Sequence, residues 1–255
     1  MITIKNEKEI DLLREGGRRH ALILSKLAEA VTPGVSTDTL NSLALSLSKE
    51  HEVIPAFLGY TPHGVHRPFP GAVCISINEE VVHGIPNENP RIVSEGDIVS
   101  IDLGLSYKGM ITDAAVTVAA GETDAESKQL LEITKKALIA GIKAAKGNGH
   151  IGDIGYAIEK TVSGSGFSIV ETLAGHGVGY AVHEDPYVSN TGRKGEGDLL
   201  KPGMVLAIEP IINEGNGRIL FSKDGYTTKT ADGKRSAHFE HTVLITDGEA
   251  EVLTQ

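Results

Sequence analysis

The segment from Gly96 to Val118 constrains the fold of this chain more than any other. Apolar residues alternate with small or polar ones on both sides of Lys108-Gly109, the pattern of two antiparallel strands joined by a tight turn. Because side chains alternate between the faces of a strand, one face of this hairpin is almost entirely apolar. That face carries Val99, Ile101, Leu103, Leu105, Thr112, Ala114, Val116 and Val118.

The order of elements around the hairpin recurs along the chain. Apolar residues have helical spacing, and therefore predict helices, in four segments: 8–31, 37–49, 124–146 and 151–163. Thr37 is the expected N-cap of the second helix. Strand-like runs separated by Pro and Gly follow each helical pair. Two helices followed by strands, twice, predict two αβ halves, roughly 1–120 and 121–255, packed as a single domain, 1–255.

Composition excludes several classes of protein. The 255 residues are 40% hydrophobic, enough to bury a substantial core. No apolar run reaches the ~18 residues of a membrane span, and the N-terminal residues lack a signal-peptide pattern. The single cysteine, Cys74, excludes an intramolecular disulfide and fits a reducing compartment, so we expect a cytoplasmic protein. A formal charge of −10 argues against nucleic-acid binding.

The other face of the hairpin carries two carboxylates. With a two-residue turn, Asp113 lies opposite Gly104 and diagonal to Asp102, about 7–8 Å away at the backbone. A solvent-exposed face is the ordinary explanation for a single aspartate in a strand. Two carboxylates with small neighbours, backed by an apolar face, favour a cation between them, because like charges repel where solvation is poor.

Three further segments supply ligands of the same kind. His176 stands between Gly175 and Gly177, where the backbone permits close approach. Glu209 and Glu240 each lie in an otherwise apolar strand-like run, 204–210 and 239–245 respectively. A glutamate in such a run is rarely buried unless it is paired or bound to metal. A buried Lys or Arg could serve as the partner, but neither run contains one.

Two Asp, two Glu and one His form a set dominated by hard oxygen ligands. Such a set suits Mn²⁺, Fe²⁺ or Co²⁺, and Zn²⁺ less distinctively. Four carboxylates exceed what one divalent ion needs for charge balance, and two divalent ions ~3.5–4 Å apart fit the number of ligands. The identity of the metal stays open.

These residues resemble the methionine aminopeptidases of type I, in the pita-bread family that also contains prolidase, aminopeptidase P and creatinase. The resemblance covers essentially the whole chain. It implies an α+β pita-bread fold, with pseudo-two-fold αβ halves around a curved antiparallel sheet and helices outside. It rests on Val81-Val82-His83-Gly84-Ile85-Pro86, Asp102 with Asp113, Gly175-His176-Gly177, His183-Glu184-Asp185-Pro186, Glu209-Pro210 and Glu240-His241-Thr242.

The resemblance also implies a role for each site residue. Asp102 would hold one ion and His176 with Glu209 the other, while Asp113 and Glu240 bridge them. The implied activity is removal of the initiator methionine from nascent proteins when the second residue is small. A hydroxide bound to the dinuclear metal centre would attack the first peptide bond.

Three residues would take part in the chemistry itself. Glu209 would act as general base, His183 would stabilise the oxyanion, and His83 would contact the scissile amide. Without the matching ligand set, both histidines would be interpreted as ordinary loop or core residues.

The family's methionine pocket corresponds to six residues, and the sequence departs from the family pattern there in two ways. The segment Thr61–Pro68 is longer than expected, and the aliphatic Val182 stands where an aromatic residue is expected. His63 and His66 in that segment suggest an extra metal site, although a proline-rich loop is favoured. The six pocket residues are Phe57, Tyr60, Phe69, Cys74, Val182 and Tyr226.

Partners and alternatives follow from the same resemblance. The 25 residues between His183 and Glu209 leave no room for the insertion of the type II enzymes. A non-catalytic peptide- or partner-binding module is the second hypothesis, and the complete ligand set argues against it. The expected partners are N-termini of nascent polypeptides, with a transient ribosome contact left open. We expect a monomer without membrane contact.

Overall fold

Two pairs of helices alternate with strands in the predicted order. The computed structural model describes residues 1–62 and 64–255. The first half contains α1 (Glu7–Glu29), α2 (Thr37–Glu50), β1 (Ile54–Pro55), β2 (Cys74–Ile77), β3 (Glu80–Val82), β4 (Ile98–Tyr107) and β5 (Met110–Ala119). The second contains α3 (Ala125–Ala144), α4 (Ile151–Val162), β6 (Ser168–Ile169), β7 (Gly175–Gly177), β8 (Glu184–Val188), β9 (Val205–Ile208), β10 (Ile211–Asn213), β11 (Ile219–Phe221), β12 (Thr228–Thr230), β13 (Ser236–His238), β14 (Glu240–Leu244) and β15 (Glu251–Val252).

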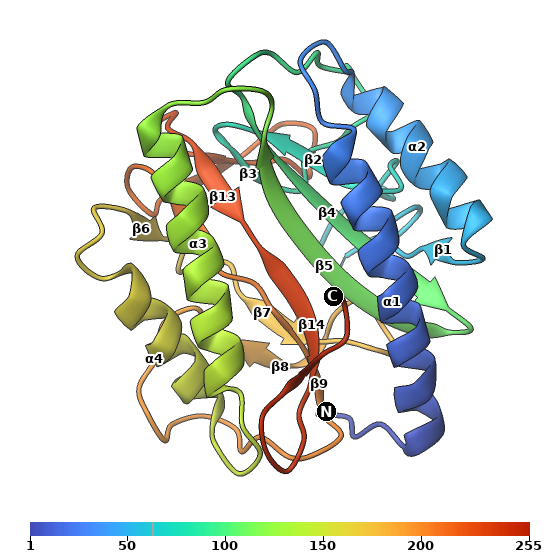
Figure 1. Cartoon of the computed structure of the whole chain (residues 1–255), viewed down its shortest axis with the longest axis vertical. Coiled ribbons are helices and arrows are strands. Elements are labelled where there is room, and N and C mark those ends of the chain that lie inside the picture. Colours follow the sequence, from blue (N-terminus) through green and yellow to red (C-terminus); the bar gives the residue numbers. More distant parts are fainter. Residues whose placement is uncertain (63) are drawn as a thin grey trace.

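A nine-stranded antiparallel sheet joins the two halves. Its strand order is β1-β4-β5-β14-β9-β7-β8, with β2 paired to β4 and β15 to β14. The halves meet where β5 pairs with β14, and α1 and α3 cover the same face of the sheet on either side of that seam (Figure 1). Two smaller sheets, β13-β10-β6 and β11-β12-β3, complete the described topology. The face of the large sheet away from α1 and α3 is left for the site.

The hairpin β4–β5 has the predicted register. Tyr107 pairs with Met110 across a two-residue loop, and Gly104 pairs with Asp113. Lys108 and Gly109 have φ of +48° and +86°, the left-handed values that a tight hairpin turn demands. The apolar face of the hairpin packs under α1 in a buried cluster that includes Ile23, Leu27, Ile101, Leu103 and Leu105.

The helices end within about two residues of the predicted limits, but the N-cap of α2 differs from the prediction. Ser36 is the N-cap, because its hydroxyl accepts the backbone N–H of Thr39 at 3.0 Å. Thr37 is the first helical residue, and its buried hydroxyl donates to the carbonyl of Pro86 at 2.6 Å. The prediction for Thr37 was therefore wrong by one position, since that hydroxyl serves a tertiary contact.

A second buried cluster lies between the helices α3 and α4 and the sheet, and it also includes Ile98 of β4. Leu138 of α3 and Ile154 and Ile158 of α4 pack with Leu206 of β9 and Val243 of β14. Among the described helices, none combines the length and apolar character needed to cross a membrane.

Candidate metal centre

Asp102 and Asp113 are buried at the middle of the large sheet. Their exposed fractions are 8% and 3%, so this face of the hairpin is not the solvated surface that a single aspartate would have suggested. A cross-strand hydroxyl fixes the backbone at the second aspartate. Thr242 Oγ1 accepts from the N–H of Asp113 at 2.8 Å and donates to its carbonyl at 2.7 Å. The carboxylates are therefore held on a rigid element away from bulk water.

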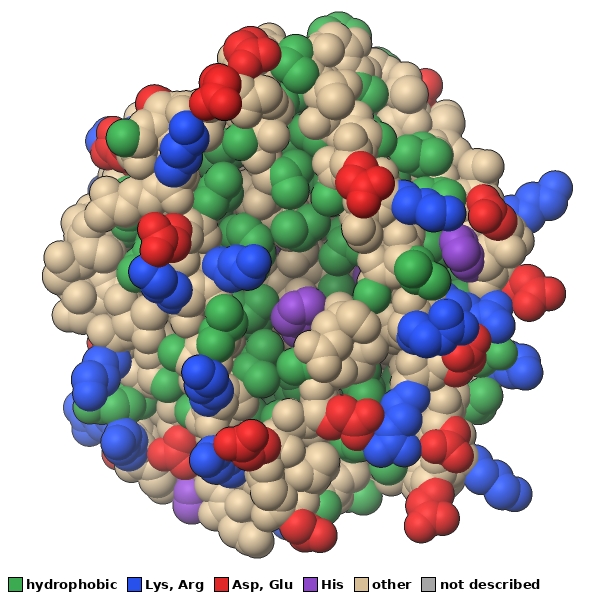
Figure 2. Space-filling view, in the orientation of Figure 1, with side chains coloured by type: hydrophobic (Ala, Val, Ile, Leu, Met, Phe, Trp, Pro, Cys, Tyr) green, Lys and Arg blue, Asp and Glu red, His purple; other side chains and the backbone are tan. Residues whose placement is uncertain are grey.

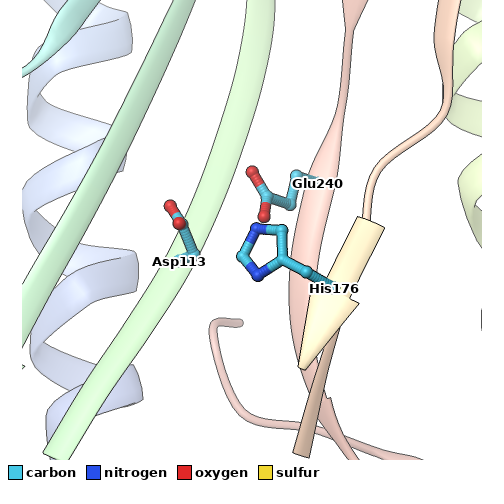
Figure 3. Close-up of side chains that lie close together, drawn as sticks. All are labelled: Asp113, His176 and Glu240. Carbon is cyan, nitrogen blue, oxygen red and sulfur yellow. The ribbon is translucent and has the colours of Figure 1, made fainter. Parts of the chain in front are cut away.

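Three other strands bring the remaining predicted ligands to the same place. His176 lies on β7, Glu240 on β14, and Glu209 directly after β9. Figure 3 shows Asp113, His176 and Glu240 pointing toward one another from three strands, with one ligand atom of each within 4.8 Å of the others. The Nε2 of His176 is also 3.5 Å from Glu209 Oε1. All five residues predicted as ligands, Asp102 included, line one cavity.

The structure adds His238, which the sequence analysis missed. Its Nε2 lies 3.3 Å from Glu209 Oε2 and 3.7 Å from Glu240 Oε2. Glu209, His238 and Glu240 form a second group whose ligand atoms lie within 4.8 Å of one another. The available signal was spacing: His238 stands two residues before Glu240, so strand alternation puts both side chains on one face.

Burial raises the pKa of all four carboxyl groups, and repulsion between the carboxylates adds to the effect in three of them, Asp102, Asp113 and Glu240. Burial and the nearby Glu209 raise the pKa of Asp113 to about 8, and burial raises that of Glu209 to about 8. Burial, followed by the facing carboxylates, raises the pKa values of Asp102 and Glu240 well above their ordinary range. Four carboxyl groups buried close together, away from solvent, cannot all ionise without a compensating positive charge.

The histidines respond in the opposite sense. Burial lowers the pKa of His176 to about 3, with a further contribution from His183, and burial lowers that of His238 to about 3. Both imidazoles are therefore neutral at physiological pH, which is the form that coordinates a metal ion.

Buried oxygen atoms without hydrogen-bond partners indicate whether the cluster is suited to bind a cation. Asp102 Oδ1, Asp113 Oδ1 and Glu240 Oε1 are buried and have no hydrogen-bond partner among the described residues. Buried carboxylate oxygens without a partner are costly, and a divalent cation would satisfy all three at once. Hard oxygens with one or two imidazoles are the donors that Mn²⁺, Fe²⁺, Co²⁺ and Zn²⁺ accept. The residues present fit a divalent-metal centre.

His83 and His183 face the same cavity as the carboxylates. His83 directly follows β3 and has φ of +60°, and Gly84 after it has no room for a side chain, because a Cβ would lie 2.2 Å from the carbonyl oxygen of Ile75. The rings of His176 and His183 are in edge contact at 4.5 Å between centroids. Although His83 is exposed to the cavity, the surrounding protein and the nearby histidines lower its pKa to about 4.

An apolar chamber adjoins the cluster. The cavity has a volume of about 150 Å³ and is lined on its apolar side by Phe57, Tyr60, Phe69, Cys74 and Tyr226. Val182 packs in the same buried cluster without lining the cavity. Gly104 admits Phe57 against the hairpin, since a Cβ there would lie 2.5 Å from the phenyl ring. The six predicted pocket residues are thus neighbours.

Backbone hydrogen bonds join the two ends of the segment between Tyr60 and Phe69. The N–H of Phe69 donates to the carbonyl of Tyr60 at 2.8 Å, and the N–H of Gly59 donates to the carbonyl of Phe69 at 2.9 Å. The extra residues therefore leave the pocket aromatics side by side. Pro62 borders the cavity and His66 is exposed. His63, named above with His66 as a possible metal ligand, lies outside the described residues.

The structure is a helix-covered antiparallel sheet that brings four carboxylates and His176 to one cavity, with His238 beside two of the carboxylates. This arrangement defines a metal-dependent hydrolase of the pita-bread class. A model of metallopeptidase family M24 matches residues 11–247. Methionine aminopeptidase 1 of Bacillus subtilis is 41% identical over 255 residues, 100% of both chains. The methionine aminopeptidase of Clostridium perfringens is 43% identical over 254 residues, 100% of this chain and 99% of its own.

Solved structures of related proteins have the same fold as this chain. The crystal structure of methionine aminopeptidase from Thermotoga maritima has a TM-score of 0.95 at 42% identity and covers 100% of both chains. Prolidase from Pyrococcus furiosus has a TM-score of 0.75 at 22% identity, over 99% of this chain and 65% of that one, and shares the fold. The chain belongs to metallopeptidase family M24. It is a metal-dependent hydrolase with the predicted pita-bread fold, and its carboxylate–histidine cluster is positioned to hold divalent ions.

Proposed function

We propose that this protein is a methionine aminopeptidase that removes the initiator methionine from polypeptides whose second residue is small. The proposal rests on one observation: a single cavity is lined by both a ligand cluster and an apolar chamber. A buried carboxylate–histidine cluster lies at one end, and an apolar chamber with an aromatic and thiol lining lies at the other. Such a chamber suits an unbranched thioether side chain. Relatives at 41% and 43% identity over their full length carry the name of this activity.

Five residues would hold the metal: Asp102, Asp113, His176, Glu209 and Glu240. Their strands come from both halves of the chain, so the ions would lie at the seam between β5 and β14. The number of carboxylates supports two ions. Bound divalent ions supply Lewis acidity that polarises the scissile carbonyl and lowers the pKa of water.

The chain's own groups perform the remaining steps. Glu209 takes the proton of the attacking water on a carboxylate oxygen, because the carboxylate lines the cavity and bound cations would keep it ionised there. His183 donates a hydrogen bond to the oxyanion as the carbonyl becomes tetrahedral. His83 contacts the scissile amide from the opposite side. His238 places a second imidazole nitrogen 3.3 Å from Glu209 Oε2.

The five pocket residues that line the cavity would bind the methionine side chain, and Val182, packed in the same cluster, would help to exclude water from it. The aromatic edge contact of Phe69 with Tyr226, 5.1 Å between centroids, forms one wall. Cys74 is buried in the wall, and burial raises the pKa of its thiol well above the ordinary value. The thiol therefore stays neutral and acts as a small apolar surface.

Hydrolysis of short peptides tests the proposal. With Mn²⁺ or Co²⁺ added, the protein should release methionine from Met-Ala-Ser and leave Ala-Pro peptides intact, and chelation should abolish the reaction. Cleavage of Ala-Pro with Met-Ala-Ser untouched would assign the chain to a prolidase-like activity. Binding of the peptides without cleavage in the metal-loaded protein would favour the non-catalytic binding module.

The setting of the activity is part of the same proposal. The substrates are N-termini of nascent polypeptides, which the protein would meet in the cytoplasm, with the ribosome contact left open. Residues 1–255 act as a single catalytic domain with halves at about 1–120 and 121–255. Support for this comes from a sheet that draws strands from both halves and from ligands contributed by both.

A further inference from the structure

The backbone around His183 is anchored on the side away from the cavity. The carboxylate of the next residue, Glu184, accepts hydrogen bonds from Lys5 Nζ at 2.7 Å, Thr3 Oγ1 at 2.6 Å and the N–H of Ala181 at 3.0 Å. The Lys5–Glu184 pair is almost entirely buried, with side-chain exposures of 1% and 8%. These contacts fix the position of the His183 backbone, but they leave its imidazole free to rotate.

The imidazole itself is held by Tyr60. The phenol oxygen lies 2.9 Å from His183 Nδ1, and the two rings are 5.7 Å apart between centroids. Tyr60 is in turn fixed at its backbone, which accepts from the N–H of Phe69 at 2.8 Å and donates to the carbonyl of Phe57 at 2.9 Å. A rigid hydroxyl therefore faces one nitrogen of a ring whose other nitrogen, Nε2, has no partner among the described residues.

The direction of this hydrogen bond decides which nitrogen carries the proton. In a neutral imidazole one nitrogen donates and the other accepts. If Nδ1–H donated to the phenol, only solvent would remain to accept the phenol proton, because no described residue accepts it. If the phenol donates to Nδ1, both groups are satisfied and the ring proton resides on Nε2.

We propose that Tyr60 is a positioning residue that donates its hydroxyl hydrogen bond to His183 Nδ1 and so keeps the proton of His183 on Nε2. An Nε2–H is a hydrogen-bond donor, which stabilisation of an oxyanion requires. The inference rests on the proposed function, and it gives the hydroxyl of a methionine-pocket residue a second task. Tyr60 thereby couples the wall of the pocket to the group that acts on the scissile carbonyl.

Tyr60→Phe removes the hydroxyl while keeping the ring in the pocket. In the Mn²⁺-loaded enzyme, kcat for Met-Ala-Ser should fall about tenfold, the size of one lost hydrogen bond, with KM changed less than about twofold. Tyr180→Phe is the matched control, because its hydroxyl lies in the same loop as His183 but donates to Glu9 at 2.8 Å. It should retain the wild-type kcat.

A spectroscopic readout separates this role from activity. In ¹⁵N-labelled Zn²⁺-loaded protein, the His183 signals, assigned by comparison with His183→Gln, should show a protonated Nε2 in wild type and a mixture of tautomers in Tyr60→Phe. A protonated Nδ1 in wild type, a Tyr60→Phe kcat equal to that of Tyr180→Phe, or loss of bound metal in Tyr60→Phe would each overturn the inference. Failure of wild type to cleave Met-Ala-Ser would instead overturn the proposed function, since the spectra report the tautomer independently.

Discussion

Glu209 is proposed both as a metal ligand and as the general base, and one substitution can remove these roles without disturbing the fold. Glu209→Gln keeps the shape of the side chain but removes its charge and its capacity to accept a proton. We expect turnover of Met-Ala-Ser to fall by at least about 10²-fold, the contribution of a well-placed general base. Circular dichroism should be unchanged. The exposed Glu249→Gln is the control, and equal activity in both variants would contradict the role assigned to Glu209.

The raised carboxyl pKa values predict how pH acts on the metal-free protein. Asp113 and Glu209 have folded pKa values of about 8 against ordinary values of 3.8 and 4.5. The folded state therefore holds protons that the unfolded chain has released, so stability falls as pH rises toward 8. The buried histidines act in the opposite direction, but mainly below their ordinary pKa of 6.5.

Between pH 6.5 and 8, the Tm of chelated protein should therefore decrease. Saturating Mn²⁺ should reduce this decrease, because the cation replaces the protons. Asp113→Asn removes one of the two groups and should flatten the slope in chelated protein. A Tm that rises over this range in the absence of metal would show that the carboxyl groups are ionised in the folded protein.

Single residues were predictable from sequence when their chemistry conflicted with their surroundings. An acid in an apolar strand has few explanations, which is why Glu209 and Glu240 could be singled out without a structure. His238 was missed because a histidine is unremarkable in a strand, and its relation to Glu209 depends on how β9 and β14 pair. The hydrogen bond of Tyr60 to His183 joins residues far apart in the sequence, so only the fold reveals it.

At the scale of elements, the β4–β5 turn offers an isolated test of backbone conformation. Gly109 is exposed with φ of +86°, and a Cβ there would have no atom within 4 Å. Gly109→Ala should thus cost only the strain of a left-handed residue, about 1–2 kcal/mol. Tm should fall by a few degrees. Lys108→Gly relieves strain at the neighbouring position and should not lower Tm comparably. A larger decrease in Tm for Lys108→Gly than for Gly109→Ala would contradict the turn geometry.

Elements with a clear periodicity were predicted well, and those fixed by tertiary contacts were not. The hairpin register followed from alternation and a two-residue turn, both local properties. The N-cap of α2 was misplaced because Thr37 and Ser36 are both good caps, and a distant carbonyl, that of Pro86, engages the first. The short strands of the second half, such as β7 with its Gly175-His176-Gly177, carry no pattern that sequence alone could resolve.

For the whole molecule, the proposed ligands connect the two halves. Asp102 and Asp113 belong to the first half, while His176, Glu209 and Glu240 belong to the second. Divalent ions would therefore act as a cross-link across the β5–β14 seam, as well as neutralising the buried carboxylates. An ion at 100 times its dissociation constant adds about 2.7 kcal/mol to the free energy of unfolding.

For a chain of this length, that stabilisation corresponds to about 5–10 °C in Tm. Thermal unfolding after chelation, and again after adding Mn²⁺ or Co²⁺, measures the shift. Asp113→Asn should respond less to added metal than wild type, whereas the exposed Asp247→Asn should respond equally. If metal is shown to bind and Tm stays constant, the site is formed equally in the unfolded chain, which would exclude the proposed cross-link.

Substrate choice depends on the whole cavity. In the proposed complex the pocket fixes the methionine side chain and the cluster fixes the scissile carbonyl, so the second residue would lie beside His83 and His183, which line the same cavity. A large side chain there would displace the carbonyl from attack geometry, and a displacement of about 1 Å costs about 10²-fold in rate. We expect kcat/KM for Met-Ala-Ser to exceed that for Met-Ile-Ser by about that factor, with a larger effect on kcat than on KM. Free Met-Ile-Ser should still inhibit cleavage of Met-Ala-Ser, because the methionine pocket can bind it. Equal cleavage of both peptides would show that the two histidines do not confine the second residue.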